Sequence, residues 1–306
     1  LPGCTDYNVT ELYSSIAREI HTEGHVVTLT AANRFYVDET IALKSDYQNH
    51  VKDNYNVTVR NINLRDKKNA AKKMSKFVEK VSKGSIKNVV TAERINDNSL
   101  AFLINAVRFL GKWENQFDHS STQSRMFMGL TGQRKMDFMQ TTGHYRVNRD
   151  ETFGTVLLLP YTKYGFNFFI IMSNEPSDIK QMRGELTGEK MSQIMQNSTS
   201  EYVHITVPKF KVESEFDGVE VLNKMGVTHL NDLPNISSTP FSVGQIKHSA
   251  TIKTTEEGTE ATAATIVQFV PRSSAFFNKP SYIVIDSPFL FGIMKNDHIL
   301  FIGQYV

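Results

Sequence analysis

The segment from Glu256 to Ser273 places the strongest constraint on how this 306-residue chain can fold. Its first ten residues include one Gly, three Ala and three Thr, a composition that tolerates many backbone geometries. Side chains alternate between the two faces of a strand. If the segment formed a strand, the side chains on one face would be uncharged and mostly small, namely Thr259, Ala261, Ala263, Thr265, Val267 and Phe269. Entry into a sheet would then bury no charge on that face. The segment therefore suits two states, an exposed loop and a strand within a sheet.

An arginine lies near the end of this segment, in the order Pro271-Arg272-Ser273. An exposed Arg suits a protease specificity pocket that carries an acid at its base. Pro271 fixes its own φ and holds the preceding residue extended. The sequence thus predicts a protease-contacting loop in which Phe269, Val270 and Pro271 precede Arg272. The alternative interpretation is an ordinary Thr/Ala-rich surface loop that contains an arginine.

The order Glu-Glu-Gly-Thr-Glu-Ala from Glu256, followed by an Ala/Thr-rich stretch, resembles the hinge and reactive-centre loop of the serpin family. In that family the scissile bond follows the residue fourteen positions after the hinge Gly, which is Arg272 here. The resemblance therefore implies Arg272-Ser273 as the reactive bond, within a reactive-centre loop of about residues 256–281. It implies a hinge formed by Glu257, Gly258, Thr259, Glu260, Ala261, Ala263 and Thr265.

Further motifs in the same order extend the resemblance over residues 6–306. They are Ala-Asn-Arg-Phe-Tyr from Ala32, Gly-Lys-Trp from Gly111, Val-Pro-Lys-Phe-Lys-Val-Glu-Ser from Val207 and Pro-Phe-Leu-Phe from Pro288. The resemblance implies that Asn105, Trp113 and His248 lie in the region where a sheet opens to admit the loop.

Apolar periodicity gives a coarse set of elements. It predicts helices over residues 6–22, 40–54, 67–83, 176–196 and 219–225, and strands over 26–37, 56–59, 101–109, 156–161, 166–172, 203–214 and 248–254, with hairpins at 131–132 and 295–297. The resemblance implies an α+β serpin fold: a large, mostly antiparallel central sheet, further sheets, helices packed around them and an exposed loop. We expect one domain over residues 1–306. Because the chain begins at about the family's fourth helix, we expect a processed, cut or incomplete chain.

Composition and motifs give no support for an enzyme. With 34 Lys plus Arg against 32 Asp plus Glu, the chain carries no strong charge that would indicate nucleic acid or a membrane surface. No stretch of eighteen apolar residues, nucleophile elbow, phosphate-binding loop or dinucleotide fingerprint is present. His21 and His25 have helical spacing, but Gly24 lies between them and the Glu is misplaced for a zinc motif. We therefore expect neither a metal nor a cofactor, and Cys4 is a poor nucleophile candidate.

Two features bear on partners and compartment. Seven lysines between Lys67 and Lys83 form a basic helix face that could bind polyanions such as heparin, but Glu79 interrupts the run and no aromatics interleave, so we expect a solvated face. Glycosylation sequons begin at Asn8, Asn56, Asn197 and Asn235. The lone Cys4 excludes an intrachain disulfide. We expect a monomer, with an extracellular location favoured over a cytoplasmic one.

The resemblance implies covalent suicide inhibition of a trypsin-like serine protease with Arg specificity. After cleavage at Arg272-Ser273 the loop would insert into the sheet. The alternative is a non-inhibitory serpin relative that acts as a carrier, chaperone or storage protein.

Overall fold

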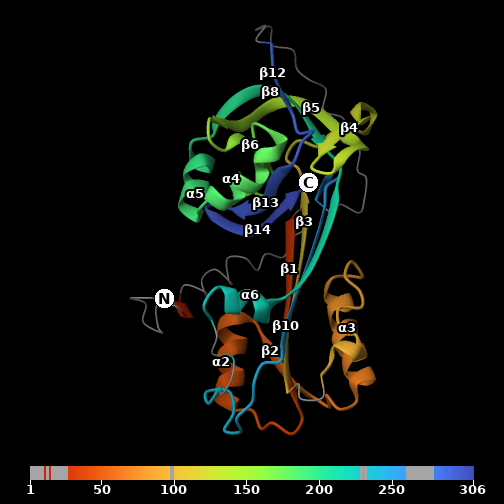
Figure 1. Ribbon diagram of the computed structural model, residues 1–306, viewed down its shortest axis with the longest axis vertical. Helices are drawn as coiled ribbons and strands as arrows, with labels where there is room; N and C mark the ends of the chain where they lie inside the picture. The colour runs from red at the N-terminus through yellow and green to blue at the C-terminus, as the bar shows by residue number, and fades with distance from the viewer. Residues whose placement is uncertain are drawn as a thin grey trace. The chain divides into compact units, whose positions relative to one another are not determined.

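A computed structural model describes residues 27–96, 100–227, 233–259 and 279–306, together with residues 10, 11, 14 and 230 (Figure 1). The strands are β1 (Val27–Asp38), β2 (Thr58–Ile62), β3 (Ala101–Lys112), β4 (Gln123–Gly129), β5 (Gly132–Asp150), β6 (Gly154–Pro160), β7 (Phe166–Met172), β8 (Thr199–Pro208), β9 (Lys211–Asp217), β10 (Gln245–Lys253), β11 (Gly258–Thr259), β12 (Ser281–Val284), β13 (Phe289–Lys295) and β14 (His298–Tyr305). The helices are α2 (Ser45–Tyr55), α3 (Lys67–Val81), α4 (Ile179–Glu185), α5 (Gly188–Gln196) and α6 (Gly218–Lys224), with short 3-10 turns at Ala92–Arg94, His119–Ser121 and Pro176–Asp178. Within these ranges, no helix is long and apolar enough to cross a bilayer.

The chain forms two compact units. The first contains Thr28–Phe109 and Glu213–Ile252, and the second contains Leu110–Val212 and Lys253–Val306.

A six-stranded sheet has the order β2-β1-β3-β10-β9, with β11 paired to β3 beside this path. The β1–β2 and β3–β10 pairs are parallel. In the first unit, α3 covers one face of the sheet. Its buried residues Ala70, Met74 and Val78 recur at helical spacing and pack with Tyr36 and Phe102. Alternate residues of a strand point to opposite sides of the sheet. On the other face of β1, Phe35 and Val37 therefore pack in a second cluster with Ile41, Ala101 and Phe241.

The second unit contains an eight-stranded sheet of order β12-β8-β5-β6-β7-β13-β14, with β4 paired to β5. The β12–β8 pair is parallel, and the other pairs whose register is known are antiparallel. Helices α4 and α5 cover one face through Ile179, Met182, Met191 and Met195, which pack on strand residues such as Phe169. These methionines are therefore core residues.

These observations confirm the α+β fold class, with two local corrections. The single helix predicted over 176–196 is two helices, because Thr187 starts a new one: its side chain accepts a hydrogen bond from the Lys190 N–H. The single strand predicted over 203–214 stops at Pro208 and restarts at Lys211. Between them, Phe210 exchanges hydrogen bonds with Thr254, which follows β10.

Candidate functional site

The candidate site is built around the turn from Thr254 to Thr259, which we call the hinge turn. The Thr255 N–H donates to the Gly258 carbonyl oxygen at 2.8 Å, which closes the turn. Directly after it, β11 pairs antiparallel with the end of β3, with Gly258 opposite Lys112 and Thr259 opposite Gly111. Two residues of a strand antiparallel to β3 are therefore already in place.

Gly258 lies where no side chain fits. A Cβ on this residue would stand 1.9 Å from the carbonyl oxygen of Gly111, a backbone atom that cannot move aside cheaply. The close approach of the two backbones at the start of β11 therefore requires glycine.

Thr259 is fully buried, and its hydroxyl lies 2.5 Å from the phenol oxygen of Tyr161. Burial raises the pKa of Tyr161 well above its ordinary value, so its phenol is neutral at physiological pH. The Tyr161 ring is stacked on Trp113, with centroids 4.8 Å apart. The hydroxyl of Thr259 is thus held in an otherwise aromatic environment.

Three donors from the segment after β3 hold the backbone of the hinge turn. The indole Nε1 of Trp113 donates to the Thr255 carbonyl oxygen at 2.9 Å. The backbone N–H of Trp113 donates to the carbonyl oxygen of Glu257 at 3.0 Å, and that of Phe117 donates to the carbonyl oxygen of Glu256 at 2.9 Å. These contacts fix the direction in which the chain enters β11.

The Glu256 carboxylate is buried, with an exposed fraction of 1%. Its Oε1 accepts hydrogen bonds from Lys209 Nζ at 2.8 Å and from Thr122 Oγ1 at 2.7 Å. Burial alone would raise the pKa of this carboxyl, but the Lys209 and Thr122 hydrogen bonds outweigh it and lower the pKa below its ordinary 4.5. Glu256 is therefore an ionised anchor that joins the hinge turn to Thr122, just before β4, and to the segment after β8.

The neighbouring Glu257 contacts His119, whose Nε2 lies 2.7 Å from Glu257 Oε1. Nδ1 of the same imidazole lies 3.6 Å from Glu256 Oε2. His119 belongs to a short 3-10 turn and is 58% exposed, so the imidazole joins the two hinge carboxylates at the edge of solvent.

Two of the predicted sheet-opening residues lie together in the first unit. His248 on β10 is directly opposite Asn105 on β3. Nδ2 of Asn105 donates to Oδ1 of Asn33, and the His248 ring stacks on Phe216 with centroids 4.7 Å apart. Burial lowers the pKa of His248. Trp113 belongs to the second unit, where it contacts the hinge turn and the aromatic core.

The remaining predicted loop residues lie outside the described residues: Glu260, Ala261, Ala263, Thr265, Phe269, Val270, Pro271, Arg272 and Ser273. No sequence motif predicted the anchoring partners, which are Tyr161, Lys209, Thr122 and His119. Lys209 belongs to a family-like string, which could have singled it out, whereas His119 and Thr122 carry no local signal.

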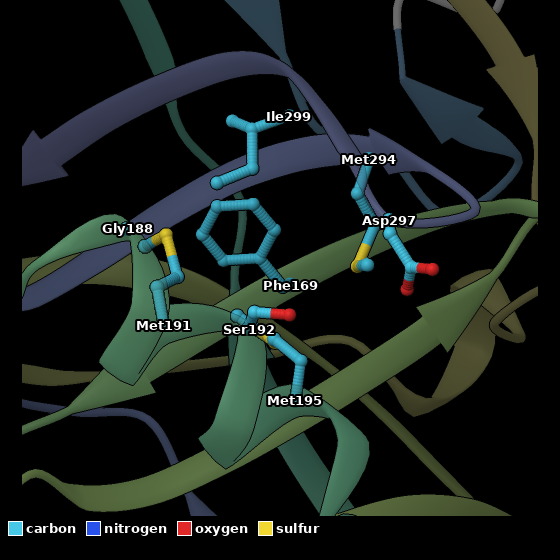
Figure 2. A pocket seen from close by; sticks show the side chains of 8 residues that line it. All are labelled: Phe169, Gly188, Met191, Ser192, Met195, Met294, Asp297 and Ile299. Carbon is cyan, nitrogen blue, oxygen red and sulfur yellow. The ribbon is translucent and has the colours of Figure 1, made fainter.

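A small cavity lies elsewhere in the second unit, between α5 and strands β7, β13 and β14 (Figure 2). Its volume is about 40 Å³, which is room for a few water molecules. Ser192 and Asp297 are the polar residues of its lining. The rest of the lining is mostly apolar and includes Phe169, Met191, Met195, Met294 and Ile299. This cavity is too small for a drug-sized ligand, which needs a pocket of about 300–1,000 Å³.

Comparison with known proteins gives consistent matches. The family model described as "Serpin (serine protease inhibitor)" matches residues 4–306. Serpin B6 of Pongo abelii is 28% identical over 306 residues, covering 96% of this chain and 80% of the relative. The crystal structure of Serpin48, a highly specific serpin of the insect Tenebrio molitor, matches with a TM-score of 0.87 and 27% identity over 98% of this chain and 81% of that chain. Human thyroxine-binding globulin, crystallised with its hormone, shares the fold, with a TM-score of 0.85 and 20% identity over 97% of this chain and 80% of that chain.

Proposed function

Because this chain belongs to the serpin family of serine protease inhibitors, we propose that it traps trypsin-like proteases covalently at the Arg272-Ser273 bond. An Arg at this position suits a protease pocket with an acid at its base. The observation that carries the proposal is the register of the hinge turn against β3 and β10.

Two independent registers predict the same place for the inserted loop. If the antiparallel pairing of Thr259 with Gly111 continued along β3, Thr265 would lie opposite Asn105. The bridge between Thr254 and Thr259, continued along β10, would bring the same Thr265 opposite His248. Asn105 and His248 are themselves paired across β3 and β10. A strand that enters between β3 and β10 would therefore be in register with both neighbours.

The energetics favour such an insertion. The β3–β10 pair is parallel over seven residue pairs, from Gln245 opposite Phe102 to Thr251 opposite Arg108. An added strand would pair on both of its edges, and antiparallel pairs are slightly more stable per residue. With about 0.5–1.5 kcal/mol net for each hydrogen bond, ten additional bonds would supply on the order of 10 kcal/mol. The residues that would share a face with the buried Thr259 are small and uncharged: Ala261, Ala263 and Thr265.

The proposed chemistry follows from this movement. The protease serine attacks the carbonyl carbon of Arg272, the peptide bond breaks, and the amine of Ser273 leaves as a new N-terminus. The acyl-enzyme remains attached to Arg272 while the loop inserts and carries the protease with it. Deacylation requires the oxyanion hole to be placed within a fraction of an ångström, so distortion of the bound protease would stop it.

A direct test is incubation with trypsin, followed by denaturing electrophoresis and N-terminal sequencing. We expect a denaturant-resistant 1:1 complex and a released peptide that begins at Ser273. Arg272→Ala should abolish complex formation, whereas the matched control Arg272→Lys should retain it, because trypsin accepts both basic residues. A sequence that begins elsewhere, or a complex that persists in Arg272→Ala, would contradict the assignment.

The alternative function is that of a carrier, chaperone or storage protein, which the fold similarity to thyroxine-binding globulin keeps open. The cavity between α5 and the sheet, about 40 Å³ in volume, is too small for a carried ligand. A second pocket of about 470 Å³, lined by Arg146, Tyr161 and Asn167 among others, is within the usual size range of ligand pockets. Clean cleavage after Arg272 without any trapped protease would favour this alternative.

A further inference from the structure

His119, Glu256 and Glu257 bring three metal-ligating side chains together at the hinge turn. One ligand atom from each lies within 4.8 Å of the others. Two ligands bound to one Zn²⁺ ion, each at about 2.1 Å, stand about 3.4 Å apart in tetrahedral geometry. At present Nε2 of the imidazole lies 2.7 Å from Glu257 Oε1 and Nδ1 lies 3.6 Å from Glu256 Oε2, so the carboxylates contact different ring nitrogens. An ion would be bound by one of these nitrogens and by both carboxylates, and rotation of the exposed His119 side chain would reduce the 4.8 Å spread of the ligand atoms to that spacing.

The second, independent observation concerns Oε2 of Glu256. This atom is buried, and within the described part of the chain it has no hydrogen-bond partner. The other carboxylate oxygen, Oε1, is satisfied by Lys209 and Thr122. Oε2 instead faces His119 Nδ1 at 3.6 Å. A buried anionic oxygen that lacks a donor is costly, and a cation bound beside it would remove that cost.

The local charge also favours a cation. Glu256 and Glu257 contribute two carboxylates to the cluster, whereas the ammonium of Lys209 pairs with the other oxygen of Glu256, Oε1. An imidazole with two carboxylates is a ligand set for Zn²⁺ and similar transition ions, whereas Ca²⁺ and Mg²⁺ take oxygen ligands. We propose that His119, Glu256 and Glu257 form a site for a divalent transition-metal ion, with Zn²⁺ as the representative.

Such an ion would join the 3-10 turn at His119–Ser121 to the two residues that precede Gly258. His119 is 58% exposed, so the ion can enter directly from solvent. Bound metal would hold the hinge turn in its present conformation, because both carboxylates would have to leave the ion before the turn could move. This consequence for loop insertion rests on the proposed function, whereas the metal site itself does not.

The test is calorimetric titration of ZnCl₂ into the full chain at neutral pH, without any protease. We expect one saturable site, reversed by a chelator and unaffected by excess Ca²⁺. His119→Ala and Glu257→Gln should each weaken the binding by at least about tenfold, as loss of a ligand requires. The matched control is His144→Ala, which removes an exposed histidine on β5 and should leave binding unchanged.

Circular dichroism of each variant establishes that the fold is retained before the titration. Absence of saturable binding to the unmodified chain would overturn the proposal, and so would equal affinity in His119→Ala. Because no protease is present, a failure to inhibit trypsin would leave this result intact, and the two proposals can fail separately.

Discussion

The hydrogen bond between Thr259 and Tyr161 can be isolated by substitution. Thr259→Val replaces the hydroxyl with a methyl group of nearly the same size, so no cavity forms and the hydrogen bond is lost. The two oxygens lie 2.5 Å apart and both side chains are buried, so we expect a cost near the upper end of the usual net range, about 1–2 kcal/mol. This corresponds to a factor of about 5–30 in the ratio of folded to unfolded protein.

The assay is urea denaturation monitored by the fluorescence of Trp113, the only tryptophan in the chain. Since its indole stacks on the Tyr161 ring, the signal reports on this site directly. The same measurement on Tyr161→Phe and on the double variant completes a mutant cycle. We expect Thr259→Val to cost much less in the Tyr161→Phe background. An equal cost in both backgrounds would show that the hydroxyl pair contributes nothing and would refute the argument.

Three further predictions concern the hinge turn. Gly258→Ala should destabilise the protein by about 1–3 kcal/mol, measured by urea denaturation, because the new Cβ meets backbone at 1.9 Å. The pKa of Glu256 is lowered on folding, so its contribution to stability is present above pH 4.5 and is lost as the pH falls below that value. Glu256→Gln should therefore reduce the loss of stability between neutral and acidic pH. An unchanged loss would contradict the role of Lys209. Thr259→Arg should leave the loop cleavable by trypsin but abolish complex formation, because a buried guanidinium without a partner costs several kcal/mol. The control Glu260→Arg should change little. An unchanged stoichiometry of protease trapping in Thr259→Arg would argue against insertion.

Much of the fold could be predicted from local pattern. The apolar runs at residues 101–109 and 166–172 predicted β3 and β7, because strands buried on both faces read as continuous apolar stretches. The division of residues 176–196 into two helices depended on one capping side chain, Thr187, which the apolar pattern did not indicate.

The candidate site was only partly predictable. Gly258 and Thr259 belong to a local motif, whereas the groups that hold them come from distant segments. Lys209 and Glu256 are 47 residues apart, and His119 and Glu257 are 138 apart. Such pairs are created by the tertiary fold and have no spacing rule in a single sequence. The ligands of the proposed metal site carry no sequence motif for the same reason, because known metal motifs describe ligands that lie close together in the chain.

The position of β12, β13 and β14 has a consequence for the protein after proteolysis. All three strands follow the proposed cleavage point, and β13 lies between β7 and β14 with Phe289 and Ile293 fully buried. Removal of these side chains from the sheet would expose a large apolar surface. A chain cut after Arg272 should therefore persist as a non-covalent heterodimer, which elutes as one species in size-exclusion chromatography and separates into two polypeptides only in denaturant.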